Sequence, residues 1–158
     1  MDSKIMIITI DQFDKLKELY PDDDFTEYKV KRINQIINKE LDIFVIEKDH
    51  KYVGEMTATY VNGELETETI PNVRIYFQAL RVLEEYQNMG LAQKLIKYVI
   101  DYYEKLGYTE FTIGVEEDNY IAKHIYRKLG FTKIIDKCIE QNSNKVIYTL
   151  YLRSEEDF

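Results

Sequence analysis

Apolar residues recur along the chain in two spacings, and each spacing predicts a different kind of element. In several stretches alternate positions are apolar or β-branched, a pattern typical of strands that bury one face. In other stretches the apolar residues lie three or four positions apart, which is typical of amphipathic helices. On this basis strands are predicted at residues 4–10, 42–47, 52–61, 73–82, 111–115, 131–139 and 145–152.

Four stretches have the helical spacing. Asp11 is expected to cap the first helix, and Asp118 or Asn119 the fourth, because short polar side chains accept hydrogen bonds from the free N–H groups at a helix start. Gly107 is expected to end the third helix. The predicted buried faces are Phe13, Leu16 and Tyr20; Val30, Ile33, Ile37 and Leu41; Leu91, Leu95, Val99, Tyr102 and Leu106; and Ala122, Ile125, Tyr126 and Leu129.

The predicted elements follow the order β-α-α-β-β-β-α-β-α-β-β. This order indicates an α/β fold, with an α+β mixed sheet and helices on both of its faces. Residues 73–115 form a strand, a crossover helix and a strand, which predicts that the two strands pair in parallel. A chain of 158 residues is most simply one domain, so a single domain is expected over residues 1–158.

The charge and composition exclude several classes of partner. The chain carries 29 acidic and 21 basic residues, and its net charge of −8 argues against nucleic acid, which needs a basic face. One cysteine allows no intrachain disulfide, and with two histidines it is too little for a zinc site, so no metal is expected. No apolar stretch is long enough to span a membrane or to form a signal peptide, so no membrane is expected and a cytoplasmic location is predicted.

The candidate chemistry begins at residues 87–92, which read Gln-Asn-Met-Gly-Leu-Ala between the strand at 73–82 and the third helix. The first N–H groups of a helix have no partner within it and attract anions. Gly90 lets the backbone approach a ligand closely, and Ala92 leaves room for one. The segment therefore predicts a phosphate-binding turn. Glu84 and Glu85, just upstream, must then point away, since they would repel such a ligand.

A second motif spans the fourth helix. It reads Asn119-x-x-Ala-x-x-x-Tyr126-x-x-x-Gly-Phe131. Together with Leu80-Arg81-Val82 and residues 87–92, it closely resembles the GNAT superfamily of N-acetyltransferases over residues 73–152. The resemblance implies a GNAT-like acyl-CoA N-acyltransferase fold, in which strands four and five splay apart, usually at a bulge.

The resemblance also implies acetyl-CoA as the co-substrate and gives individual residues roles. Backbone groups of Leu80 and Val82 would pair with the pantetheine arm, and Asn119 would hydrogen-bond to that arm. Tyr126 would lie beside the thioester sulfur as the catalytic residue. Amides of the turn would hold the pyrophosphate, and the cofactor-binding residues on it are Gln87, Asn88, Met89, Gly90, Leu91 and Ala92.

A phenol suits the place beside the sulfur because it can stabilise or protonate the departing thiolate of coenzyme A. The sequence leaves the general base open. Many members of the family carry a glutamate on the fourth or fifth strand, whereas residues 73–82 contain no acid. The alternatives are Glu55 on the third strand, Glu116 at the end of the fifth, or water held by Tyr76, Gln78 or Glu116.

The predicted function is transfer of an acetyl group from acetyl-CoA to a primary amine of a small molecule, peptide or protein, by direct attack. The family lines its acceptor site with loops that here contain residues 22–24 (Asp-Asp-Asp) and the acidic residues of 64–68, which favour a cationic acceptor. The alternative is a non-catalytic acyl-CoA-binding or regulatory module on the same fold. The chain has 14 tyrosines, more than a core requires, and a homodimer is one way to cover the excess.

Overall fold

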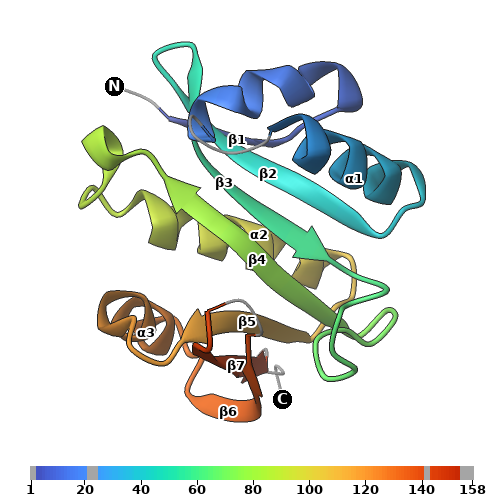
Figure 1. Ribbon diagram of the computed structural model, residues 1–158, viewed down its shortest axis with the longest axis vertical. Coiled ribbons are helices and arrows are strands. Elements are labelled where there is room, and N and C mark those ends of the chain that lie inside the picture. Colours follow the sequence, from blue (N-terminus) through green and yellow to red (C-terminus); the bar gives the residue numbers. More distant parts are fainter. Residues whose placement is uncertain (1–2, 21–24, 141–142, 154–158) are drawn as a thin grey trace.

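In the computed structural model, which describes residues 3–20, 25–140 and 143–153, seven strands form one mixed sheet in the order β1-β2-β3-β4-β5-β7-β6 (Figure 1). All neighbours are antiparallel except β4 and β5, which are parallel as predicted. The strands are β1 (Lys4–Ile7), β2 (Leu41–Lys48), β3 (Lys51–Thr59), β4 (Arg74–Val82), β5 (Glu110–Glu116), β6 (Lys133–Ile139) and β7 (Val146–Arg153).

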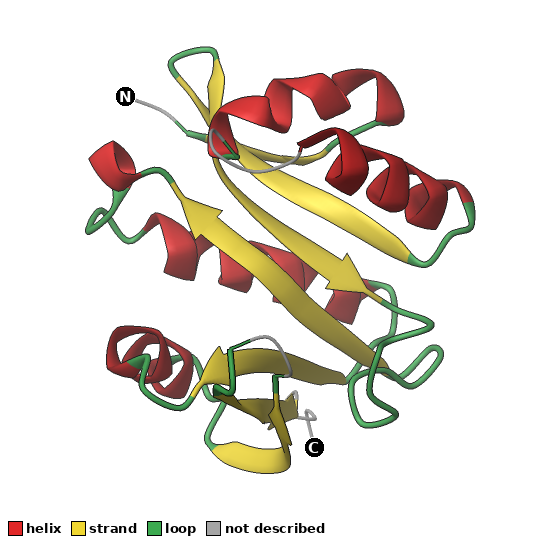
Figure 2. Cartoon of the chain, in the orientation of Figure 1, coloured by secondary structure: helices red, strands yellow, loops and turns green. Residues whose placement is uncertain are grey.

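Helices lie on both faces of this sheet (Figure 2). The 3₁₀ helix η1 (Ile10–Leu19) and α1 (Phe25–Ile37) pack on one face, which we call the front face. Helices α2 (Leu91–Lys105) and α3 (Tyr120–Lys128) pack on the other, the back face, and a short 3₁₀ turn, η2 (Glu84–Tyr86), precedes α2. None of the helices in the described ranges is long and apolar enough to cross a membrane.

Each face of the sheet has its own hydrophobic core, because alternate residues of a strand point to opposite faces. On β2, Ile43 and Val45 belong to the front core, whereas Phe44 and Ile46 belong to the back core. All four side chains are fully buried. The short apolar run at residues 43–46 is therefore a strand buried on both sides, which explains why its alternation is invisible in the sequence.

The parallel strands β4 and β5 separate after a few residues. They pair only between residues 74–77 and 110–113. Just beyond that point β4 has a bulge, because Thr57 of β3 pairs with Gln78 while Glu55 pairs with Arg81. Two residues of β4 therefore oppose Met56 alone, and one of them, Ala79, has a φ of 56°. The splayed strands and the bulge that the family resemblance implied are both present.

The bulge also decides which way the end of β4 presents its side chains. An extra residue shifts the alternation by one, so that residues beyond the bulge exchange faces. Leu80 and Val82 consequently pack against the back core, and Arg81 lies on the front face over the ring of Tyr20, 3.9 Å from its centroid. Without the bulge, Leu80 and Val82 would point to the front.

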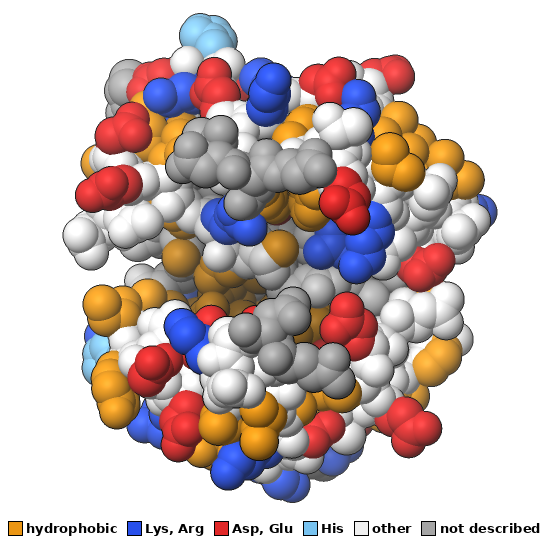
Figure 3. Space-filling view, in the orientation of Figure 1, with side chains coloured by type: hydrophobic (Ala, Val, Ile, Leu, Met, Phe, Trp, Pro, Cys, Tyr) orange, Lys and Arg blue, Asp and Glu red, His pale blue; other side chains and the backbone are white. Residues whose placement is uncertain are grey.

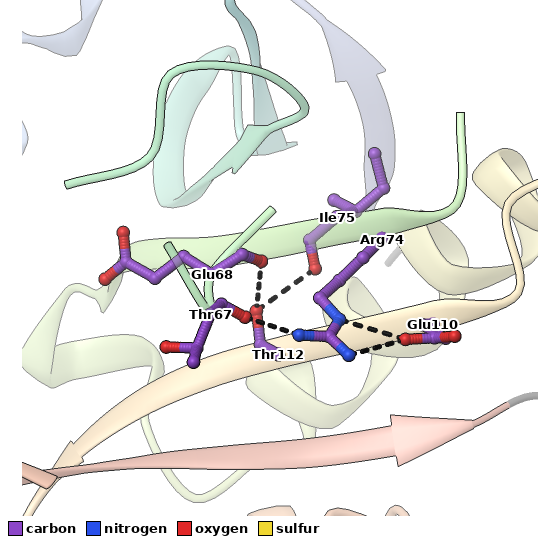
Figure 4. Close-up of polar contacts among 6 residues, drawn as sticks. All are labelled: Thr67, Glu68, Arg74, Ile75, Glu110 and Thr112. Carbon is purple, nitrogen blue, oxygen red and sulfur yellow. Dashed lines mark hydrogen bonds and ion pairs between the residues drawn. The ribbon is translucent and has the colours of Figure 1, made fainter. Parts of the chain in front are cut away.

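The segment between β3 and β4 is fastened to the sheet by polar contacts (Figure 4). Arg74 donates to Glu110 on β5 at 2.7 and 3.0 Å and to the backbone oxygen of Thr67 at 2.7 Å. The hydroxyl of Thr112 donates to the backbone oxygen of Glu68 at 2.8 Å. The predicted polar loop at residues 64–72 is thus a fixed part of the front face, and the Glu68 side chain within it is only 5% exposed.

The first strand and the first helix start differently from the prediction. The strand expected at residues 4–10 ends at Ile7, and Ile10 begins η1. Thr9, rather than Asp11, is the cap residue, and its N–H donates to the side chain of Gln12 at 2.9 Å. A run of isoleucines predicted a longer strand, but this reciprocal capping pattern favours an earlier helix start.

Two predicted helix faces were wrong in part. Val30 and Ile37 of α1 are 58% and 60% exposed, because this helix contacts the front core through other residues, among them Tyr28 and Ile36. Leu41 is buried, but it belongs to β2. At the end of α2 the predicted Leu106 is 62% exposed, and the positive φ of Gly107 ends the helix as predicted. Leu91, Leu95 and Val99 are buried as predicted, together with Ile96 and Tyr103.

Candidate functional site

The turn before α2 forms a cradle of backbone N–H groups. Asn88 and Gly90 have φ angles of 64° and 75°, which fold the chain tightly before the helix begins at Leu91. Within the described residues no group accepts a hydrogen bond from the N–H groups of residues 88–93, and the first such bond runs from Lys94 N to Gly90 O at 3.0 Å. Successive free amides at the start of a 15-residue helix make a site for an anion.

A pocket of about 510 Å³ extends from this cradle into the gap between β4 and α3. Figure 3 shows the hollow between these two parts of the surface, with hydrophobic side chains in its depth. Every predicted binding residue lines the pocket except Met89, whose side chain is 56% exposed outside it. The lining residues are Leu80, Val82, Tyr86, Gln87, Asn88, Gly90, Leu91, Ala92, Gln93, Asn119, Ile121, Ala122, Ile125 and Tyr126.

An elongated ligand with a phosphate at one end fits this pocket. The phosphate end would lie at the free amides, where a Cβ on Gly90 would meet only the side chain of Gln93 at 3.8 Å, so the cradle is open. The apolar middle would lie between Leu80 and Ile125. Tyr126, buried on the inner face of α3, lines the same pocket. A pantetheine arm with a pyrophosphate has this order of polar and apolar parts.

The residues just before the cradle do not oppose an anion. Neither Glu84 nor Glu85 lines the pocket, and the Glu85 carboxylate faces Lys51 at 3.9 Å. The Gln87 side chain donates to the backbone oxygen of Val82 at 2.9 Å and so ties the turn to the end of β4. The condition that both glutamates point away is therefore met.

Asn119 caps α3 and lines the pocket at once. Its Oδ1 accepts a hydrogen bond from the backbone N–H of Ala122 at 3.1 Å, which settles the choice between Asp118 and Asn119 as the cap. With the oxygen held by the helix, the amide NH₂ group keeps two donors for a ligand in the pocket. One side chain thus joins the position of α3 to the binding site.

Tyr126 lies on the inner face of α3 and is 7% exposed. Its ring meets Phe131 edge to face at 6.4 Å, and burial raises the pKa of its phenol to about 12. Within the described residues nothing hydrogen-bonds to its hydroxyl, and Tyr126 is one of the residues that line the pocket. The hydroxyl is held in place by packing and has its hydrogen-bonding capacity left for a ligand.

The candidates for the general base are placed very differently. Glu116 lies at the surface and pairs with Lys145 at 2.9 Å. Gln78 donates to Thr59 at 2.9 Å, and the hydroxyl of Tyr76 lies 2.9 Å from where a Cβ on Gly114 would be. Gly114 therefore leaves the room that the Tyr76 ring occupies.

Glu55, the remaining candidate, is fully buried on the front face. Its Oε1 accepts hydrogen bonds from the hydroxyls of Tyr20 and Tyr28, the latter at 3.2 Å. No described residue donates a hydrogen bond to its Oε2. Burial raises the pKa of this carboxyl to about 7, although both hydrogen bonds and the charges of Arg81 and Arg32 oppose that rise.

The acidic loops that favoured a cationic acceptor are only partly described. Residues 22–24 lie outside the described residues. In the other loop Glu68 is buried and accepts from the backbone N–H of Leu65 at 3.2 Å, and burial raises the pKa of its carboxyl. Glu68 therefore shapes its own loop and does not present an open charge.

The sequence analysis missed some residues that line the pocket. Tyr86 lies in η2, which no spacing indicated, and Gln93 lies on the first turn of α2. Ile121 does not follow the helical spacing of the predicted buried face and is 78% exposed, yet it lines the pocket. A rim residue is exposed without a ligand, and hydrophobic periodicity cannot identify it.

Comparison with known proteins agrees with this geometry. The model of the acetyltransferase (GNAT) family matches residues 6–131. N-alpha-acetyltransferase 30 of Schizosaccharomyces pombe is 29% identical over 86 residues, and the alignment covers 54% of this chain and 51% of that protein. Spermidine N(1)-acetyltransferase of Escherichia coli K12 is 33% identical over 90 residues, covering 56% and 44%. The chain thus aligns with about half the length of these curated relatives.

Solved structures share the fold over nearly the whole chain. A spermidine N-acetyltransferase chimera based on the Vibrio cholerae protein has a TM-score of 0.76 at 18% identity, covering 97% of this chain and 96% of that one. A putative acetyltransferase from Salmonella typhimurium, with acetyl-CoA bound, has a TM-score of 0.75 at 14% identity and covers 100% and 97%. At these identities the likeness shows the fold.

Proposed function

Because this chain belongs to the GNAT family of acetyltransferases, we propose that it transfers the acetyl group of acetyl-CoA to a primary amine. One observation carries the proposal: a single pocket joins the free amides before α2 to the buried hydroxyl of Tyr126. The pocket offers a place for the phosphates at one end and for the reacting thioester at the other.

The binding roles follow from the lining of the pocket. The free amides of residues 88–92 would hold the pyrophosphate, supported by the positive end of the α2 dipole. Leu80 and Val82 lie on the edge of β4 that has lost its partner β5, so their backbone groups can pair with the pantetheine amides like an added strand. The NH₂ group of Asn119 would donate to the same arm.

Tyr126 would act on the leaving group. A neutral amine attacks the thioester carbonyl, and the tetrahedral intermediate expels the thiolate of coenzyme A. With a phenol pKa of about 12, against about 8.5 for a thiol, full proton transfer to the sulfur would be uphill by about 5 kcal/mol. A hydrogen bond from Tyr126 to the developing thiolate is therefore the favoured role, with the proton transferred as the product leaves.

The acceptor is proposed to be a cationic primary amine, either of a small molecule or of a peptide or protein. The named relatives include a spermidine N(1)-acetyltransferase and an N-alpha-acetyltransferase, so both classes occur among them. Two features of this chain favour a cation: the net charge of −8 and the buried carboxyl of Glu55 on the front face of β3. The cytoplasmic location of the protein and its assembly as a homodimer stay predictions.

Titration calorimetry with acetyl-CoA, followed by a screen of amines for release of free thiol, tests the proposal. The screen should include linear polyamines, aminoglycosides, neutral amines and peptides with free N-termini. Binding of acetyl-CoA with turnover on at least one amine is expected. Binding without turnover on any of them would support the non-catalytic acyl-CoA module instead, and turnover confined to neutral amines would remove the cationic preference.

A further inference from the structure

The buried polar groups of the protein are gathered on one face of the sheet. In the described residues the buried polar or charged side chains are Glu55, Thr57, Thr59, Glu68, Thr112 and Thr149. The strand residues among them share the front face, since the residues next to them in the chain belong to the back core. These neighbours are Met56, Ala58, Phe111, Ile113 and Leu150. At these positions of β3, β5 and β7 the front face is therefore polar, whereas the back face of the same strands is apolar.

Two of these groups lack a partner, and they lie side by side. Neither Oε2 of Glu55 nor Oγ1 of Thr57 hydrogen-bonds to any described residue, although both atoms are buried. The two residues are separated by one position on β3 and so point to the same face. They pair with Arg81 and Gln78, the residues on either side of the bulge in β4.

These two unpaired atoms lie beside the place where β4 separates from β5. The bulge marks the place where β4 leaves β5, so the gap that receives the thioester opens there. The back face beside the gap is filled by α2 and α3, and an amine must therefore approach from the front. Glu55 lies one strand away from the open edge of β4, about 5 Å in a sheet.

An unpaired buried carboxylate oxygen is costly, and an ammonium group supplies what it lacks. Such a group loses its hydration without compensation, which costs on the order of 1–3 kcal/mol or more for a charged group. An alkylammonium has three N–H donors, enough to reach both Oε2 of Glu55 and Oγ1 of Thr57. An ionised Glu55 would repel a carboxylate or a phosphate at the same place.

We propose that Glu55 is the proton acceptor for the incoming amine and that its Oε2 receives the proton. This role rests on the proposed acetyltransfer and deepens it. One N–H bond of the ammonium breaks, its proton goes to Oε2, and the electron pair left on nitrogen forms the C–N bond with the acetyl carbonyl carbon. The C–S bond then breaks with its electron pair on sulfur. The second nitrogen proton goes to that sulfur by way of Tyr126, and Glu55 releases its proton to water.

The surroundings of Glu55 suit a base that works near neutral pH. The titratable and charged groups facing it in the described residues are Tyr20 after η1, Tyr28 and Arg32 on α1, and Arg81 on β4. On β2 the apolar Val45 lies opposite it in the ladder. Burial raises its pKa to about 7, so the carboxyl is poised to take up and release a proton there.

The pH dependence of kcat/KM for wild type, Glu55→Gln and Glu116→Gln tests the role, with an amine from the screen as acceptor. Wild type should show a rising limb with a midpoint near pH 7. Glu55→Gln should lose that limb and fall about 100-fold or more at pH 7.5, while its affinity for acetyl-CoA stays within about twofold of wild type. The difference in kcat/KM between wild type and Glu55→Gln should become smaller toward pH 10, where the free amine loses its proton unaided. Glu116→Gln should keep the wild-type limb.

The Arg81→Gln variant tests the role of Glu55 independently, because it does not require the Glu55 variant to fold. The charge of Arg81 lowers the pKa of Glu55, so its removal should move the limb to higher pH. The role would be overturned if Glu116→Gln lost the rising limb or if Arg81→Gln left it in place. It would also be overturned if Glu55→Gln kept the limb, or if its kcat/KM fell by the same factor at every pH. A wild type inactive on every amine would refute the proposed function itself.

Discussion

Replacing Glu55 by Gln should make the protein more stable at alkaline pH, with almost no gain in acid. The carboxyl has an ordinary pKa of 4.5 when exposed in the unfolded chain and about 7 in the folded one. The folded protein therefore holds this proton more tightly. As the pH rises from 4.5 to 7 the unfolded chain binds fewer protons than the folded chain, so the free energy of unfolding falls across that window.

The size of the effect follows from the two pKa values. Their difference, 7 minus 4.5, is about 2.5 and corresponds to about 3 kcal/mol. Because Glu55 is fully buried, solvent does not screen this cost. A Gln side chain keeps an oxygen for the hydroxyls of Tyr20 and Tyr28 but carries no charge to desolvate. The stability of the variant relative to wild type should thus increase by about 3 kcal/mol between pH 4.5 and pH 8.

Urea denaturation of both proteins at pH 4.5 and pH 8 measures this change, because titration of all other groups cancels in the comparison. A melting temperature should move with it, by roughly 6–12 °C at 2–4 °C per kcal/mol for a chain of this size. Glu116→Gln removes a surface carboxylate and is the matched control, expected to show no comparable change. If the advantage of Glu55→Gln is the same at both pH values, Glu55 is not a buried ionisable group and the argument for its role as a base fails.

Substitutions at three residues test the pocket. Tyr126→Phe should cut turnover at least tenfold with little change in acetyl-CoA affinity by calorimetry; unchanged turnover would remove its role at the leaving group. Gly90→Ala forces a side chain into a φ of 75° and should cost about 1–2 kcal/mol of stability by urea denaturation, together with affinity for acetyl-CoA; no loss of either would show that the turn needs no glycine. Asn119→Asp keeps an oxygen to cap α3 and should retain the melting temperature, whereas Asn119→Ala should lose about 0.5–2 kcal/mol. Both should bind acetyl-CoA more weakly, since both lack the amide donor, and full affinity in Asn119→Asp would leave the residue with a capping role alone.

The sequence alone determined the order of elements, the parallel crossover and the family. These features depend on short-range signals: hydrophobic spacing, glycine at positions of positive φ, and two motifs in register around Gly90 and Tyr126. The same signals failed for residues whose burial depends on how a helix packs against the sheet. Val30 follows a helical spacing but faces solvent, because α1 packs at an angle that only its partners on the sheet decide.

Only the tertiary structure decided which face of the sheet each polar side chain occupies, and that choice separates the candidates for the base. In the sequence Glu55 on the third predicted strand and Glu116 at the end of the fifth are equivalent candidates. In the fold Glu116 pairs with a lysine at the surface, while Glu55 is buried beside an unpaired threonine opposite the bulge. The bulge itself is a single residue, Ala79, that no local signal marks, since alanine seldom adopts a positive φ. The pairing of β3 with β4 on one side and the loss of β5 on the other hold it there, and these are contacts between residues far apart in the chain.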